Sequence, residues 1–197
     1  PQYQLKFHHG MSVKRAAHDL SEGKIDAAAN VFDPNIRAYL SEPLFRFTDV
    51  AVTLKSKNIV IRNITDLKGK SVATYQGANI SMGQEFKKII PSFSEYREIP
   101  KPTNAVRLLA VGRCDVTILD IYIFLHGLRT WSQGKYKPDL FDFHRIFPDI
   151  YTHMAFKDKN IRDDFNRALK EIRKNGKYEA IYERYLRELG YLAMNGY

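Results

Sequence analysis

The strongest constraint on the fold is a short pattern that occurs twice, as "EGKIDAAANVF" (22–32) and as "VGRCDVTILD" (111–120). In each copy a glycine is followed by a basic residue, an apolar residue, an aspartate and a run of small or β-branched residues. Each copy also follows a segment with helical periodicity. Glycine takes the left-handed conformation that ends a helix, and the aspartate can bond backbone donors where a strand begins. The pattern is therefore typical of a joint between a helix and a buried strand.

The two joints lie roughly ninety residues apart, at Gly23 and Gly112. This spacing favours two similar α/β lobes, although a single doubly wound sheet that uses one loop twice stays open. Segments with strand and helix periodicity alternate through the chain, which is typical of an α/β protein with mainly parallel sheets. The predicted elements include a strand at 3–8, a strand buried on both faces at 25–32, a loop at 131–148 and two final helices separated by Gly176.

Composition excludes several classes of protein. The chain of 197 residues has a formal charge of +9, but its basic residues are scattered, which favours a solvated basic surface over a nucleic-acid interface. An anionic ligand or an acidic partner surface stays open. No apolar run approaches the ~20 residues of a membrane helix, so no membrane span is predicted. The single cysteine, Cys114, excludes an internal disulfide and a cysteine-based metal site.

Motifs of catalysis are missing from the sequence. The six histidines have no metal-binding spacing, and neither a nucleophile elbow nor a phosphate-binding glycine loop occurs. We therefore predict no metal, no cofactor and no catalysis, although an acid/base pair that only the fold would bring together stays open.

Three places at the carboxyl ends of predicted strands favour binding instead, because ligands of open α/β sheets lie there. In "NVFDPNIR" a strand ends and a turn presents Arg37, which is either a carboxylate ligand or a surface ion-pair residue. In "ATYQGAN" Gly77 ends a strand, and the N–H groups at the start of the next helix suit an anion. Asp120 follows a buried strand as a helix cap or a cation-holding group. The residues expected to contact a zwitterion are Asn30, Val31, Phe32, Arg37, Tyr75, Gly77, Ala78 and Asp120.

The sequence resembles the periplasmic solute-binding proteins of ABC transporters, in the polar amino-acid branch called bacterial extracellular solute-binding protein family 3. The resemblance covers nearly all of the chain and rests on five motifs in the family's order. These motifs are "LSEGKIDAAANVFDPNIR" (20–37), "LSEPLF" (40–45), "ITDLKGKSVATYQGA" (64–78), "AVRLLAVGRCDVTILD" (105–120) and "YTHMAFKDKNIRDDFNRALKEIRKNGKYEAIYERYL" (151–186).

The resemblance implies a two-lobed periplasmic-binding-protein type II fold with two hinge strands and a ligand held between the lobes. Lobe one would comprise residues 1–52 and 150–197, and lobe two residues 53–149. Arg37 would bind the ligand carboxylate, helped by the backbone near Asn30 and Gly77–Ala78, and Asp120 would bind the ammonium group. The implied ligand is an amino acid or a similar zwitterion or carboxylate. The implied location is the periplasm, and an ABC permease is a possible partner.

Three features depart from the family pattern. The strand and helix that normally precede residues 3–8 are absent, so lobe one is expected to be incomplete, either in a fragment or in a chain that a partner completes. Ala78 replaces the usual threonine or serine, and the link from Arg37 to "SEPL" is shorter than usual.

Two other readings of the sequence stay open. An enzyme on the same scaffold, dehydratase-like and acting on a small carboxylic acid, would use Asp120, Tyr75 or His153 as its acid or base. A degenerate interaction domain would have lost its ligand. The sequence leaves undetermined which ligand is bound and whether the chain serves import or sensing.

Overall fold

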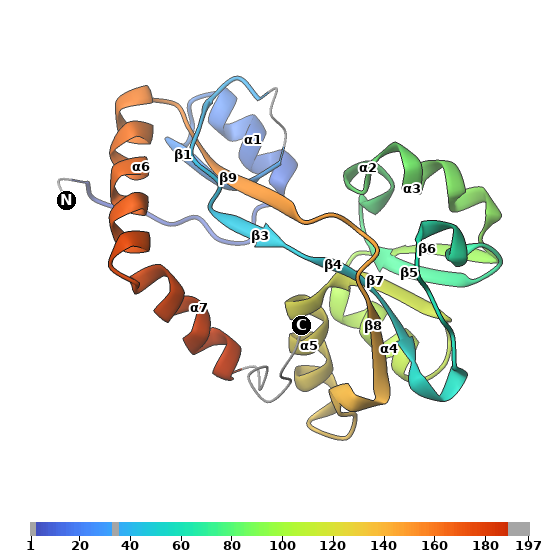
Figure 1. Ribbon diagram of the computed structural model, residues 1–197. Helices are drawn as coiled ribbons and strands as arrows, with labels where there is room; N and C mark the ends of the chain where they lie inside the picture. Colours follow the sequence, from blue (N-terminus) through green and yellow to red (C-terminus); the bar gives the residue numbers. More distant parts are fainter. Residues whose placement is uncertain (1–2, 33–35, 189–197) are drawn as a thin grey trace. The chain divides into compact units, whose positions relative to one another are not determined.

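The chain forms two compact units in the computed structural model, which describes residues 3–32 and 36–188 (Figure 1). One unit comprises residues 1–46 and 151–181, and the other comprises residues 47–150 together with the chain from Tyr182. The chain therefore passes between the units at 46–47, at 150–151 and again at 181–182.

The first unit contains a small sheet in the strand order β1-β9-β2, with β3 also paired to β9. Its core consists of Leu20, Ala28, Val31 and Ala155. Helices α6 and α7 follow β9 and are separated by Gly176, as predicted, with a left-handed φ of 74° at this glycine. The elements from the start of the chain are α1 (Val13–Ser21), β1 (Ala27–Val31), β2 (Tyr39–Leu40) and β3 (Phe45–Phe47). The elements near the end of the chain are β9 (Ile150–Phe156), α6 (Lys159–Lys174) and α7 (Lys177–Glu188), and the boundary between the units falls within α7, after Ile181.

The second unit is built on a five-stranded sheet in the order β6-β5-β7-β4-β8. Its strands are β4 (Asp49–Leu54), β5 (Ser71–Tyr75), β6 (Glu95–Ile99), β7 (Val116–Asp120) and β8 (Phe141–His144). Its helices are α2 (Ala78–Ser81), α3 (Gly83–Ile89), α4 (Pro102–Ala110) and α5 (Ile121–Ser132). Four 3-10 turns lie at Lys55–Lys57, Ile64–Leu67, Ile90–Ser92 and Pro138–Leu140.

Both faces of this sheet are covered by apolar side chains. Val50 and Val52 of β4 pack into the core that contains Phe124 of α5, whereas Ala51 packs into the core that contains Phe86 of α3. Because both faces are buried, every residue of β7 is buried and the strand reads as a continuous apolar run in the sequence.

The two predicted joints are present, one in each unit, and their geometry is the same. Gly23 and Gly112 have φ values of 69° and 73°. The glycine N–H and the N–H after it bond carbonyls of the last helical turn, at 3.0 and 2.8 Å in the first joint and 2.9 and 2.8 Å in the second. This is the Schellman ending, which glycine favours because it has no Cβ. At the second joint the Asp115 carboxylate accepts the Ser71 N–H at 3.0 Å, as expected of the aspartate.

Several predicted elements differ in the structure. Residues 3–8 form no strand, since no other segment in the described part of the chain pairs with them, and a strand needs a partner for its backbone groups. Residues 131–148 contain β8, which pairs with β4, rather than a continuous loop. Strand β1 is antiparallel to β9 and has one exposed residue, so it is not buried on both faces. Strand β5 pairs in parallel with β6 and β7, whereas β4 is antiparallel to β7 and β8, and β2 is antiparallel to β9.

Candidate functional site

The carboxyl edge of the sheet in the second unit gathers polar side chains from three neighbouring strands. Tyr75 ends β5 and Asp120 ends β7, two strands that run in parallel. Asp49 begins β4, which is antiparallel to β7, and it lies directly opposite Asp120 in the strand register. Side chains of directly opposed residues lie on the same face of a sheet. Two of the predicted ligand residues, Tyr75 and Asp120, are thus brought to one edge.

Asp120 acts as the N-cap of α5. Its Oδ1 accepts the N–H groups of Tyr122 and Ile123 at 3.0 and 3.2 Å, and its Oδ2 accepts the N–H of Thr48 at 2.9 Å. Only 4% of the residue is exposed. Burial raises the pKa of the Asp120 carboxyl, while the three N–H donors oppose this rise by stabilising the carboxylate. The capping role that the sequence left open is therefore present, and a cation-holding role remains a prediction.

Asp49 is a buried acid of this edge that the sequence analysis did not identify. Its Oδ2 accepts the Tyr75 hydroxyl at 2.9 Å, and that hydroxyl lies 3.0 Å from the Ser81 hydroxyl. Burial raises the pKa of Asp49 to about 6; the Tyr75 hydrogen bond lowers it and the nearby Asp120 charge raises it further. The available signal was a charged residue at the start of the largely apolar strand "DVAVTL".

Replacing Asp49 by asparagine is expected to change how stability depends on pH. An aspartate in the unfolded chain titrates near ~3.9, so between about pH 4 and 6 the folded wild type binds more protons than the unfolded chain. The contribution of Asp49 to the free energy of unfolding therefore falls as the pH rises through this window. The free energy of unfolding of Asp49→Asn, relative to that of wild type, should therefore rise by on the order of 2 kcal/mol from pH 4 to pH 7.

Urea unfolding at the two pH values measures this gain. Asp139 is exposed and its side chain forms no hydrogen bond or ion pair with a described residue, so Asp139→Asn is the control and should stay close to wild type at both pH values. A pH-independent difference for Asp49→Asn would show that Asp49 titrates in the folded chain as it does when unfolded.

Of the backbone donors predicted at Gly77 and Ala78, the Gly77 N–H is occupied by a carboxylate of the chain itself. Glu98, at the carboxyl end of β6, accepts the Gly77 N–H at 2.8 Å and the Asn79 N–H at 3.0 Å. Gly77 has a φ of 89° and forms the N-cap of α2. Glu98 could not be identified from the sequence, because nothing local to "EYREIP" indicates which turn it meets.

The predicted residues of the first unit lie at two ends of its sheet. Val31 ends β1 opposite His153, and the adjacent Asn30 has a left-handed φ of 59° at an irregularity in the strand. Phe32 follows with 42% of its surface exposed. Arg37 instead precedes Tyr39, which pairs with Phe156 near the other end of β9. The structure therefore brings Asn30, Val31 and Phe32 together and places the backbone of Arg37 away from them.

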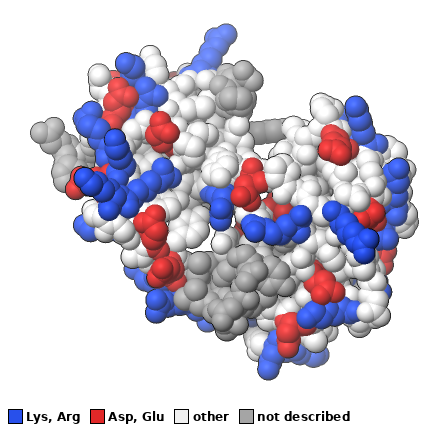
Figure 2. Space-filling model, viewed as in Figure 1, with Lys and Arg blue, Asp and Glu red and all other residues white. Residues whose placement is uncertain are grey.

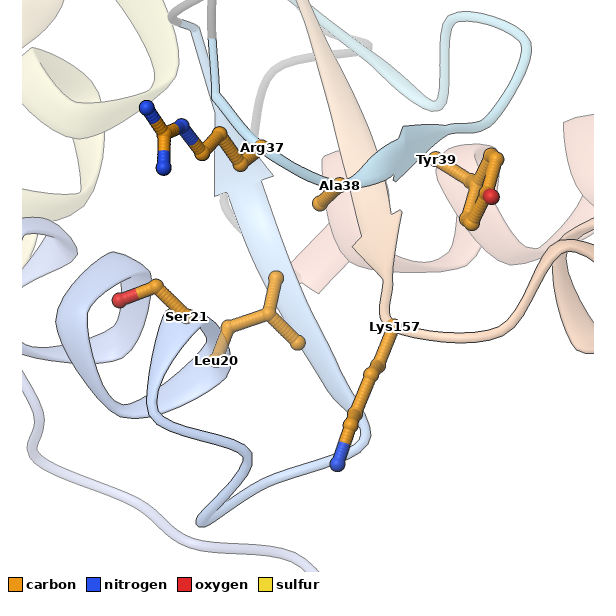
Figure 3. Close-up of a pocket in the computed structure, with 6 residues that line it drawn as sticks. All are labelled: Leu20, Ser21, Arg37, Ala38, Tyr39 and Lys157. Carbon is orange, nitrogen blue, oxygen red and sulfur yellow. The ribbon is translucent and has the colours of Figure 1, made fainter.

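Arg37 lines a pocket of about 310 Å³ in the first unit (Figure 3). Arg37 and Ser21 lie on one side of this pocket, and Tyr39 and Lys157 lie on the other. The described residues provide no hydrogen bond or ion pair to the side chains of Arg37 and Lys157, and both are exposed. The volume of the pocket is at the lower end of the range of ligand pockets, ~300–1,000 Å³. The pocket thus offers two positive charges and two hydroxyl groups.

The molecular surface agrees with the scattered charge of the sequence. In Figure 2, lysine and arginine side chains are interspersed with aspartate and glutamate on the face in view and do not form a single basic patch. None of the described helices combines the length and the apolar character that crossing a membrane requires. Among residues 3–32 and 36–188, no group of three or more histidine, cysteine, aspartate or glutamate side chains is placed to hold a metal ion.

Two α/β units, each with its own sheet, define the class of type II periplasmic-binding-protein folds. The sequence pattern of the bacterial extracellular solute-binding proteins, family 3, matches residues 2–188. The chain therefore belongs to this family, as the resemblance of its five motifs predicted.

The chain is similar to two relatives in sequence and to one solved structure in fold. The "Probable amino-acid-binding protein YxeM" of Bacillus subtilis (strain 168) is 28% identical over 188 residues, which cover 86% of this chain and 65% of that protein. The arginine-binding periplasmic protein of Mannheimia haemolytica is 24% identical, over 90% of this chain and 73% of that protein. The sensor domain of a histidine kinase with similarity to periplasmic binding proteins has the same fold, with a TM-score of 0.69, 19% identity and coverage of 88% and 75%.

Proposed function

We propose that this chain binds a small polar solute, an amino acid or a similar zwitterion or carboxylate, and has no catalytic activity of its own. The main support is that Tyr75, Asp120 and Asp49 lie together at the carboxyl edge of one sheet. Open α/β sheets bind their ligands at this edge. Membership of a solute-binding family over residues 2–188 supports the same conclusion.

The proposed roles follow from charge. Asp120 is the ammonium-binding group, because a buried carboxylate favours a cation over water. Arg37 is the carboxylate-binding group, because its guanidinium is exposed in a pocket and pairs with no described acid. Asn30, Val31, Phe32, Tyr75 and Ala78 complete the proposed set of contacts, whereas the Gly77 N–H, which was also expected to contact the solute, donates to Glu98.

The proposed context is delivery of the solute to an ABC permease or input to a sensor, outside the cytoplasmic membrane. The two relatives named above support an amino acid as the solute: one is named as an amino-acid-binding protein and the other as an arginine-binding periplasmic protein. The histidine kinase sensor domain has the same fold, so sensing is a second candidate role.

A thermal-shift screen against amino acids, dicarboxylates and polyamines tests this function. A solute present at ~100 times its dissociation constant should add about 2.7 kcal/mol to the free energy of unfolding. For a chain of this size that corresponds to several degrees of melting temperature. A cooperative melt that no solute shifts would contradict the proposal, and turnover of a bound solute would favour an enzyme.

Replacing Arg37 by alanine should weaken binding of a carboxylate-containing solute about 10- to 150-fold, since a hydrogen bond to a charged group contributes ~1.5–3 kcal/mol. Isothermal titration calorimetry measures the change. Lys170→Ala is the matched control, because Lys170 is an exposed cation of the same unit. Unchanged affinity in Arg37→Ala would show that Arg37 lies outside the ligand site.

A further inference from the structure

Glu98 is held at the start of α2 by three donors. Its Oε2 accepts the Gly77 N–H at 2.8 Å, and its Oε1 accepts the Asn79 N–H at 3.0 Å and the Tyr96 hydroxyl at 2.9 Å. Burial opposes ionisation, but the two N–H groups and the hydroxyl together lower the pKa of Glu98 below its usual value. Glu98 is therefore a carboxylate at neutral pH, with both oxygens bonded.

This arrangement changes what the adjacent edge can bind. The N–H groups at the start of a helix bind anions, so they can donate to either a carboxylate of the protein or the carboxylate of a solute. We infer that Glu98 is a specificity-determining residue, which occupies these donors with the protein's own carboxylate and so excludes the carboxylate of a solute from Gly77 and Asn79. The inference rests on the proposed function, because it concerns the solute that the chain would bind.

The charges near Glu98 indicate which solutes this edge disfavours. Glu98, Asp49 and Asp120 are contributed by strands of one sheet, and none of them forms an ion pair with a described lysine or arginine. A solute with a second negative charge would meet like charges here, and like charges near a site discriminate against that solute. A cationic or neutral amino acid therefore fits this edge better than an acidic one.

Calorimetric titration with L-arginine, L-glutamine and L-glutamate tests the inference in the wild type, Glu98→Gln and Glu98→Ala. Wild type should bind L-arginine at least ~10-fold more tightly than L-glutamate, a difference of about 1.4 kcal/mol. Glu98→Gln removes the charge at nearly constant shape, and Glu98→Ala frees both N–H groups. Both variants should reduce the preference for L-arginine over L-glutamate by ~10-fold or more.

Glu95→Gln is the matched control, because it removes one negative charge from the same strand at an exposed position. Its ratio of arginine to glutamate affinity should stay within about twofold of wild type. If wild type binds an amino acid and the ratio is unchanged in both Glu98 variants, the inference fails and the proposed function stands. If neither wild type nor variants bind any of the three amino acids, the inference fails, and the thermal-shift screen decides the proposed function.

An NMR titration tests the hydrogen bonds of Glu98 without any solute. The amide proton shifts of Gly77 and Asn79 should change with a midpoint below ~4.3, the usual pKa of a glutamate. The same change should be lost in Glu98→Gln, while a dispersed spectrum shows that the variant is folded. Amides of Gly77 and Asn79 that do not follow Glu98 would overturn the inference, whatever the chain binds.

Discussion

Replacing Asp120 by alanine is expected to lower the free energy of unfolding by about 2–4 kcal/mol. The variant loses the N-cap of α5, which contributes ~0.5–2 kcal/mol. It also leaves the N–H of Thr48 without its acceptor inside the protein, which costs ~1–3 kcal/mol. Since 1 kcal/mol corresponds to about 2–4 °C in a chain of this length, the melting temperature should fall by on the order of 5–15 °C.

Asparagine at position 120 separates the structural role from the binding role. Its Oδ1 can still accept the N–H groups of Tyr122 and Ile123, but its Nδ2 is a donor facing the Thr48 N–H. Stability should therefore fall less in Asp120→Asn than in Asp120→Ala. If Asp120 also binds an ammonium group, both variants should weaken binding of an amino acid by several-fold to hundreds-fold.

Urea unfolding and calorimetric titration of the two variants measure these effects. Asp139→Ala removes the same charge at an exposed position and should leave both quantities close to wild type. A destabilised Asp120→Asn with unchanged affinity would assign Asp120 to capping alone. Unchanged stability in Asp120→Ala would contradict the hydrogen bonds that define the cap.

The features predicted correctly from the sequence are those that depend on neighbouring residues. A glycine that ends a helix is a local event, so the joints at Gly23 and Gly112 were recognised from a few residues each. The same holds for Asp120, which directly precedes the helix that it caps. The two-unit fold was predicted from the family resemblance, which rests on the order of the five motifs.

The features that were missed depend on pairing between distant segments. Asp49 faces Asp120 only because β4 pairs with β7 in one particular register. Glu98 reaches Gly77 only because β6 lies beside β5. Strand register is set by packing of whole faces and is weakly encoded in any short window. A strand of four residues such as β8 has too little periodicity to be recognised before its partner is known.

Replacing Phe86 by alanine should cost about 3–5 kcal/mol, the usual range for a large buried aromatic side chain. Phe86 is fully buried, and its ring lies 5.9 to 6.1 Å from the rings of Phe93, Tyr96 and Phe147. Phe86→Leu keeps most of the apolar volume and should lose less. Urea unfolding compares the two variants. Phe93→Ala, at a half-buried position, should lose less stability than Phe86→Ala and more than Phe86→Leu.

Phe86 also connects the core to the carboxyl edge of the sheet. The Tyr96 ring packs against Phe86, and the Tyr96 hydroxyl donates to Glu98. A cavity in place of Phe86 gives Tyr96 room to move, so the amide shifts of Gly77 and Asn79 should change in Phe86→Ala more than in Phe93→Ala. If stability falls and these amides stay unchanged, Glu98 is held by the backbone donors alone and its position does not depend on the core. If both change together, the packing under α3 fixes the carboxylate that excludes other anions from the edge.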